Sequence, residues 1–168
     1  CSVFRGGFTL EAAESVVHMS SDEQWCLDVV NTLVENSLIR TWEQPPGQMR
    51  LGLLESIRLF AAEKLTEHST GTPIEKSAVT TRHFNFYTRM GSDESLDALF
   101  RDQGVDLYRS QIIEIDNFMT AVQASLGVSN IHCAVHCALA AHSVFDQVGP
   151  SADALALLND VLSLPEIE

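Results

Sequence analysis

The sequence predicts a mainly α-helical fold with one small β-hairpin, organised as two modules. Apolar residues recur with helical spacing along most of the chain. Two short β-prone segments flank a Pro-Pro-Gly turn at residues 45–47. A polar segment from His68 to Pro73, marked by Gly and Pro, separates the helices on either side of it. We therefore place the modules at residues 1–68 and 69–168.

The first half of the first module is predicted to be two helices. Thr9 is suited to cap a short helix over residues 10–17, and Ser21 with Gln24 forms a capping box for the next helix. That second helix carries apolar residues at the spacing of a core-facing stripe. The members of the stripe are Cys26, Val29, Val30, Leu33 and Val34.

The second half of the first module is predicted to be a hairpin and a helix. Strands at residues 38–42 and 49–51 flank the turn, and the helix after them has one apolar side made of Leu54, Ile57, Ala61 and Leu65. Helix, helix, hairpin, helix is the order of a winged helix that lacks its first helix. Residues 1–4 would be the stub of that helix, and Gly6-Gly7 the bend that leaves it.

The second module is predicted to contain only helices with short connections. They cover residues 74–90, 92–100, 130–147 and 152–162, and Gly149-Pro150 ends the third of these. A further long helix has an apolar stripe of Ile115, Phe118, Met119, Val122 and Leu126. Successive antiparallel helices of this kind are typical of the start of an α-solenoid.

Composition and charge exclude several classes of protein. The 168 residues are 45% hydrophobic, which is enough for a buried core. Ten Lys+Arg against 23 Asp+Glu give a net charge of −13, which disfavours nucleic acids and anionic membranes as partners. No apolar run reaches the roughly 20 residues of a membrane span, and no signal peptide is visible. Four scattered cysteines fit reduced thiols, so we expect a cytoplasmic protein.

Three segments of the chain carry a family resemblance. They are residues 2–14 (SVFRGGFTLEAAE), 53–61 (LLESIRLFA) and 114–118 (EIDNF). In this order and spacing they resemble the bacterial STAND-type signal-transduction ATPases, which are fused to transcription-factor, cyclase or kinase domains. The resemblance implies a winged helix followed by tetratricopeptide-like repeats, both downstream of a nucleotide-binding domain. It also implies a role in signal transduction and transcription regulation.

The resemblance further implies which residues face the nucleotide domain. The winged helix would close over that domain, while the repeats would bind a protein or small-molecule effector. Related nucleotide switches place a Met-His-Asp motif at the start of the last winged-helix helix, and the matching residues here are Leu53, Leu54 and Glu55. Leu54 has no donor for a phosphate. We therefore expect Leu54 and Ile57 to hold the closed state by packing, with polar contacts from other residues such as Arg50 or Arg58.

The sequence offers little support for catalysis. It has no Gly-rich phosphate loop, so we expect neither an enzyme nor a bound cofactor, although the parent protein would be an ATPase. Glu114 and Asp116 are two apart on a helix and diverge in direction. We interpret them as a solvated edge and a hydrogen-bonding site between helices. Asn117 would tie a helix to a loop, and Phe118 belongs to the apolar stripe.

A group of histidines and cysteines is a weak candidate for a metal site. His132 with His136, and Cys133 with Cys137, have the i, i+4 spacing that puts two ligands on one helix face. The alternative is that these small side chains fill the space between packed helices, and no second Cys/His cluster exists. We therefore expect no metal. His18, His68 and His83 are isolated and are predicted to be surface or edge residues.

Two further expectations concern partners. The chain begins at Cys1 and enters directly into an apolar stretch, which suggests a piece of a longer protein. Val3, Phe4 and Phe8 would then be uncovered, which favours a homodimer or a swapped arrangement. The rival function is a DNA-binding winged-helix module. Its recognition helix, residues 22–37, contains four acids and no Lys or Arg, so we do not expect DNA binding.

Overall fold

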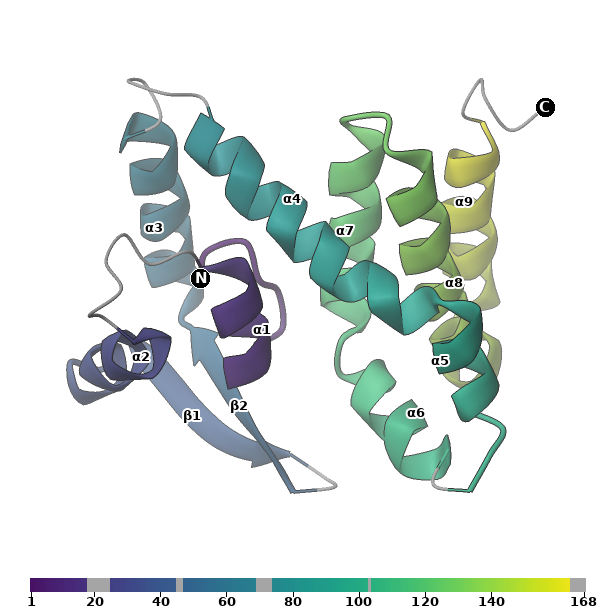
Figure 1. Ribbon diagram of the computed structural model, residues 1–168, viewed down its shortest axis with the longest axis horizontal. Coiled ribbons are helices and arrows are strands. Elements are labelled where there is room, and N and C mark those ends of the chain that lie inside the picture. Colours follow the sequence, from purple (N-terminus) through teal and green to yellow (C-terminus); the bar gives the residue numbers. More distant parts are fainter. Residues whose placement is uncertain (18–24, 45–46, 69–73, 103, 164–168) are drawn as a thin grey trace. The chain divides into compact units, whose positions relative to one another are not determined.

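The computed structural model describes residues 1–17, 25–44, 47–68, 74–102 and 104–163. Within them the chain is mainly helical and has a small antiparallel sheet of two strands (Figure 1), as the sequence predicts. The chain divides into two compact units, Cys1–His83 and Phe84–Glu168, and the division falls inside a helix. The predicted boundary segment at residues 68–73 lies mostly outside the described residues, so the module limits stay a prediction.

The first unit contains the elements predicted for the first module, which are α1 (Leu10–Val16), α2 (Cys26–Glu35), β1 (Ile39–Gln44), β2 (Gln48–Leu53) and α3 (Glu55–His68). It also contains the first part of α4 (Ile74–Thr88), a helix that was predicted for the second module. The two strands pair antiparallel, with Ile39 opposite Leu53 and Gln44 opposite Gln48. The predicted hairpin is therefore confirmed. Pro45 and Pro46 of the predicted turn lie outside the described residues.

The helix ends of this unit follow the predicted local chemistry in part. The Ala12 amide donates to the Thr9 hydroxyl at 3.1 Å, so the predicted cap of α1 is confirmed. The helix α2 begins at Cys26, with Trp25 in extended backbone before it. The proposed capping box at Ser21 and Gln24 lies outside the described residues. The predicted stripe of α2 is confirmed, because Val30 is buried and its other four members are half-buried while the remaining α2 positions are exposed.

The N-terminal segment differs from the predicted helical stub. Residues 1–9 form turns and a bend, and Phe8 pairs with Leu51 of β2 through two backbone hydrogen bonds of 2.8 Å. Phe4 stacks on Phe8 with ring centroids 4.5 Å apart, and both side chains are buried. The expectation that Phe4 and Phe8 are uncovered was therefore wrong, because they pack into the core of this unit. The predicted homodimer loses the argument on which it was based.

The second unit is helical throughout its described residues. After the last part of α4 it contains η1 (Arg89–Gly91), α5 (Asp93–Ala98), α6 (Gly104–Ile112), α7 (Ile115–Leu126), α8 (Ile131–Val148) and α9 (Ser151–Leu162). The helix α6 was not predicted, because it begins at a glycine and glycine has a low helix propensity. The other helices lie within a few residues of their predicted limits.

The helices α7, α8 and α9 lie side by side as an antiparallel stack with short connections (Figure 1). The helix α8 faces both neighbours, and small residues on it, such as Ala134, Ala138 and Ala141, are almost fully buried. Small side chains let helix backbones approach closely, which explains how α8 packs on two sides. None of the helices in the described part of the chain has the length and apolar character that a bilayer crossing needs.

Candidate functional site

The start of α3 is the candidate site that the resemblance singles out. Leu53 ends β2, Leu54 links the strand to the helix, and Glu55 begins α3. Leu53, Glu55 and Arg58 all line a cavity of about 250 Å³ within the first unit. Leu54 does not line it, and 46% of Leu54 is exposed. Three of the four candidate residues are therefore brought together, while Leu54 presents an apolar side chain to the surface.

The cavity contains an ion pair at its helical side. Arg58 is buried and donates a hydrogen bond from its Nε to the Glu55 carboxylate at 2.8 Å. Its Nη2 donates a second hydrogen bond to the other oxygen of the same carboxylate. Arg5 lies 3.7 Å from that carboxylate. The hydrogen bonds from Arg58 hold the pKa of the Glu55 carboxyl below its ordinary value, with smaller contributions from the charges of Arg58 and Arg5. Glu55 is thus an anion that orients Arg58.

The opposite wall of the cavity is built around Trp42. Its indole lies against Gly7 and Gly52, where an added Cβ would come within 2.7 Å and 2.8 Å of the ring. Gly7 also has a backbone φ of +99°, which residues other than glycine rarely adopt. The Arg40 guanidinium lies over the Trp42 ring at 5.7 Å from its centroid, in reach of a cation–π interaction. Two glycines thus make room for an aromatic wall that carries a cation.

Sequence reasoning missed most of this cavity. Arg5, Arg40, Trp42 and Gly52 were not identified as site residues, and Gly7 was read only as part of a bend. The Gly-Gly pair and the glycine within the second strand were the available signals, because a glycine in a strand marks a close approach. What they approach could not be read from the sequence. Arg5, Arg40 and Arg58 line the cavity together with one carboxylate, that of Glu55.

The residues proposed for helix packing form a buried network in the second unit. The Tyr87 hydroxyl donates to Glu114 at 3.0 Å, and the Asn117 amide donates to the same oxygen at 2.7 Å. Glu114 and Asn117 are buried, and Phe118 meets the Tyr87 ring edge-on. The predicted hydrogen bonding between helices is confirmed for Glu114. The predicted solvated edge is wrong for Glu114 and holds for Asp116, which is exposed.

The histidines and cysteines of α8 separate into two pairs. Cys133 and Cys137 are buried, and burial raises the pKa of the Cys137 thiol to about 12. His132 is exposed and His136 half-exposed. In the described part of the chain, no group of three or more His, Cys, Asp or Glu side chains could hold a metal ion. The four residues therefore do not form one ligand set.

The isolated histidines have different outcomes. His83 is buried, with its ring 5.3 Å from that of Phe4, so the prediction of a surface or edge residue was wrong. Its burial follows from contacts between α4 and the N-terminal segment, which are far apart in the sequence. His18 lies outside the described residues, as does the side chain of His68.

The surface of α2 bears on the DNA-binding alternative. No Lys or Arg occurs in α2, while Asp28 and Glu35 do. Of the two arginines in the hairpin, Arg40 is exposed and Arg50 is fully buried. Arg50 is therefore also unsuited to the interdomain contact for which it was considered.

No protein-family model, curated protein or solved structure matches this chain.

Proposed function

We propose that this chain is a non-catalytic regulatory module of a nucleotide-switch protein. Its first unit is a winged helix that docks on a P-loop nucleotide-binding domain of the same parent chain. Its second unit begins a stack of tetratricopeptide-like helices that binds a protein or small-molecule effector. The parent protein acts in cytoplasmic signal transduction or transcription regulation.

The topology of the first unit supports the winged-helix part of the proposal. The order α1, α2, hairpin, α3 is that of a winged helix without its first helix, and the bridge between Phe8 and Leu51 adds a third extended segment beside the hairpin. The antiparallel order of α7, α8 and α9 supports the repeat part.

The observation that carries the proposal is the exposure of Leu54 beside a cavity with arginines. An exposed leucine at the start of α3 can bury apolar area only against a partner. The solvent-exposed arginines of the cavity wall are Arg5, which also lies near the Glu55 carboxylate, and Arg40, whereas Arg50 and Arg58 are buried. We therefore assign the polar contact with the nucleotide domain to Arg5 and Arg40, in place of Arg50.

The test measures nucleotide release in the full parent protein. Leu54→Ala should speed the release of a fluorescent ADP analogue by about five- to thirtyfold, since losing about 1–2 kcal/mol of apolar burial weakens docking by that factor. The matched control is Leu155→Ala, a leucine of the second unit that is 62% exposed. Neither change should alter the melting temperature of the isolated chain.

Two results would overturn the proposal. One is unchanged nucleotide release in Leu54→Ala when the control also has no effect. The other is a parent coding sequence that has no P-loop domain upstream of this chain.

A further inference from the structure

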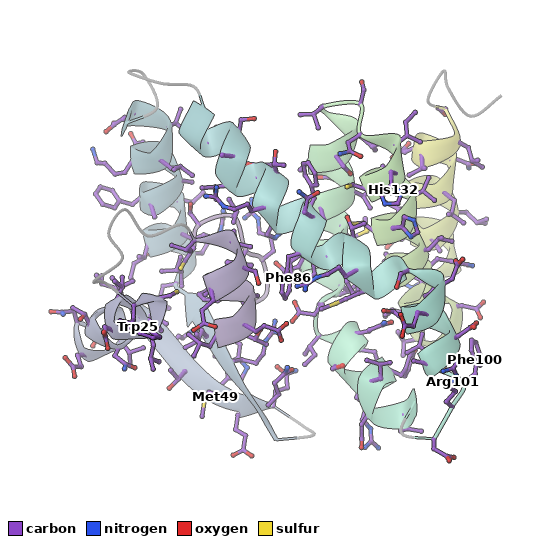
Figure 2. The ribbon with its side chains drawn as sticks, viewed as in Figure 1. Trp25, Met49, Phe86, Phe100, Arg101 and His132 are labelled. Carbon is purple, nitrogen blue, oxygen red and sulfur yellow. The ribbon has the colours of Figure 1, made fainter. Side chains whose placement is uncertain are left out.

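Two histidines, His132 and His136, lie one helical turn apart on α8. The ring centroids of His132 and His136 are 4.4 Å apart, and the rings meet at 65°. His132 projects from α8 in Figure 2 and is exposed, and His136 is half-exposed. Residues four apart share one helix face, so both rings are directed to the same patch of surface.

The backbone of η1 fixes the ring of His136. Its Nδ1 lies 2.8 Å from the carbonyl oxygen of Gly91. A carbonyl oxygen only accepts, so Nδ1 carries the hydrogen and the neutral ring keeps its lone pair on Nε2. Gly91 itself is held against α8, because an added Cβ would lie 1.7 Å from the backbone oxygen of His136. Histidine ligands of metals are oriented by this kind of hydrogen bond from the second ring nitrogen.

The neighbouring thiols do not belong to this patch. The Cys133 thiol donates to Asn85 at 3.4 Å, and Cys137 is buried near Thr88. Both sulfur atoms are buried against residues of α4, whereas the ring of His132 is exposed. His142 is six residues beyond His136, about 240° around the helix, and cannot reach the pair.

We propose that His132 and His136 form a two-nitrogen chelate for a divalent late first-row transition ion, with water in its remaining positions. Imidazole nitrogen suits Ni²⁺, Cu²⁺ and Zn²⁺. The site is open and exchangeable, unlike a structural zinc site, which is closed by four protein ligands. The two rings are neighbours only when α8 is helical, so binding of the ion also stabilises the folded chain. This inference does not depend on the proposed function.

In the experiment, Ni²⁺ is titrated into the tag-free chain under reducing conditions, and isothermal titration calorimetry measures the affinity and the number of ions bound. We expect one ion per chain. His132→Asn and His136→Asn should each weaken binding by at least about tenfold, the loss expected when a metal ligand or its immediate support is removed. The double variant should be no weaker than either single one, because one imidazole alone is not a chelate. Two control variants should bind Ni²⁺ as tightly as the unchanged chain does. They are His142→Asn on the same helix and Cys26→Ser at a half-exposed thiol.

A second measurement keeps the proposal falsifiable if His136→Asn disturbs the packing of η1. Ni²⁺ should raise the melting temperature of the unchanged chain and of His142→Asn, and should leave that of His132→Asn unchanged. His132 is exposed, so its substitution should not affect folding by itself. Unchanged Ni²⁺ affinity in His132→Asn, or loss of binding in Cys26→Ser, would overturn the proposal.

Discussion

Trp42 determines which residues are tolerated around it. Its indole occupies the space in which side chains at positions 7 and 52 would lie, and it forms one wall of the cavity. Gly7 combines this close approach with a positive φ, and Gly52 has the close approach alone. Gly47 has a positive φ of +97°, and among the described residues only the Glu43 carboxylate would lie within 4 Å of an added Cβ. Comparing the three glycines therefore distinguishes the cost of a positive φ from the cost of a steric clash with Trp42.

Alanine at these positions should destabilise the chain to different degrees. We expect Gly47→Ala to lower the free energy of unfolding by about 1 kcal/mol through its positive φ. Gly52→Ala should cost about 1–3 kcal/mol because the rigid indole must move. Gly7→Ala should cost more than either. Urea unfolding of the three variants measures this order, and equal losses for Gly7→Ala and Gly47→Ala would show that contact with Trp42 is unimportant.

The ion pair of Glu55 and Arg58 is expected to lower the pH at which the Glu55 carboxyl titrates. The pKa of Glu55 lies below its ordinary value of 4.5 because Arg58 donates hydrogen bonds to the carboxylate. With a lowered folded-state pKa, the pair stabilises the fold above pH 4.5, and this contribution is lost as the pH falls through the folded-state pKa. NMR titration of the Glu55 carboxyl should give a midpoint below 4.5. Arg58→Gln should raise that midpoint, whereas Lys64→Gln, elsewhere on α3, should leave it unchanged.

Residue-level prediction from sequence succeeded where the signal was local. The Thr9 cap depends on a hydroxyl and an amide three residues apart, so it could be read directly. The burial of His83 and Phe4 depends on a contact between residues about eighty positions apart, which no local pattern encodes. The cavity was missed for the same reason, because its walls come from the N-terminal segment, the hairpin and α3.

At the scale of elements, a buried polar network joins three parts of the second unit. Glu114, just before α7, accepts from Tyr87 on α4 and from Asn117 on α7. A buried acceptor that loses one donor costs free energy even if another remains. The network therefore fixes how α7 is placed against the last turn of α4.

Removing the Tyr87 hydroxyl tests this role. Tyr87→Phe should lower the free energy of unfolding by about 1 kcal/mol, since it removes a buried hydrogen bond and leaves the ring in place. Tyr108→Phe is the matched control, because that hydroxyl donates to the Val144 carbonyl at 3.3 Å from a partly exposed position. We expect a change within about 0.5 kcal/mol for the control. Equal effects of the two variants, measured by urea unfolding, would contradict a special role for the Glu114 network.

Most elements could be predicted because periodicity and capping are local properties. The stripe of α2 and the limits of α8 follow from apolar spacing, from the Asn130 cap and from Gly149. The helix α6 could not be predicted in this way, since it begins at Gly104 and glycine has a low helix propensity. The N-terminal segment was predicted as a helical stub, yet it pairs with β2, because strand pairing is decided by a partner distant in the sequence.

At the scale of the whole molecule, charge is distributed unevenly along the chain. All ten Lys and Arg residues occur up to Arg109, and residues 110–168 contain acids without any Lys or Arg. The helices α7, α8 and α9 therefore present an acidic surface. A protein effector with basic side chains would suit this surface better than a nucleic acid.

The net charge of −13 leads to a prediction about duplex DNA. Binding to DNA gains free energy when basic side chains release the counterions of phosphates, and each contact steepens the fall of affinity with salt. The helix α2 has no Lys or Arg, and Arg50 of the hairpin is buried. We therefore expect no binding to duplex DNA at physiological salt in a fluorescence-polarisation titration. Sub-micromolar, sequence-dependent affinity that weakens in Asn31→Ala would contradict this expectation, because Asn31 is an exposed side chain of α2 suited to read a base. That result would favour a DNA-binding function of the first unit over the proposed docking function.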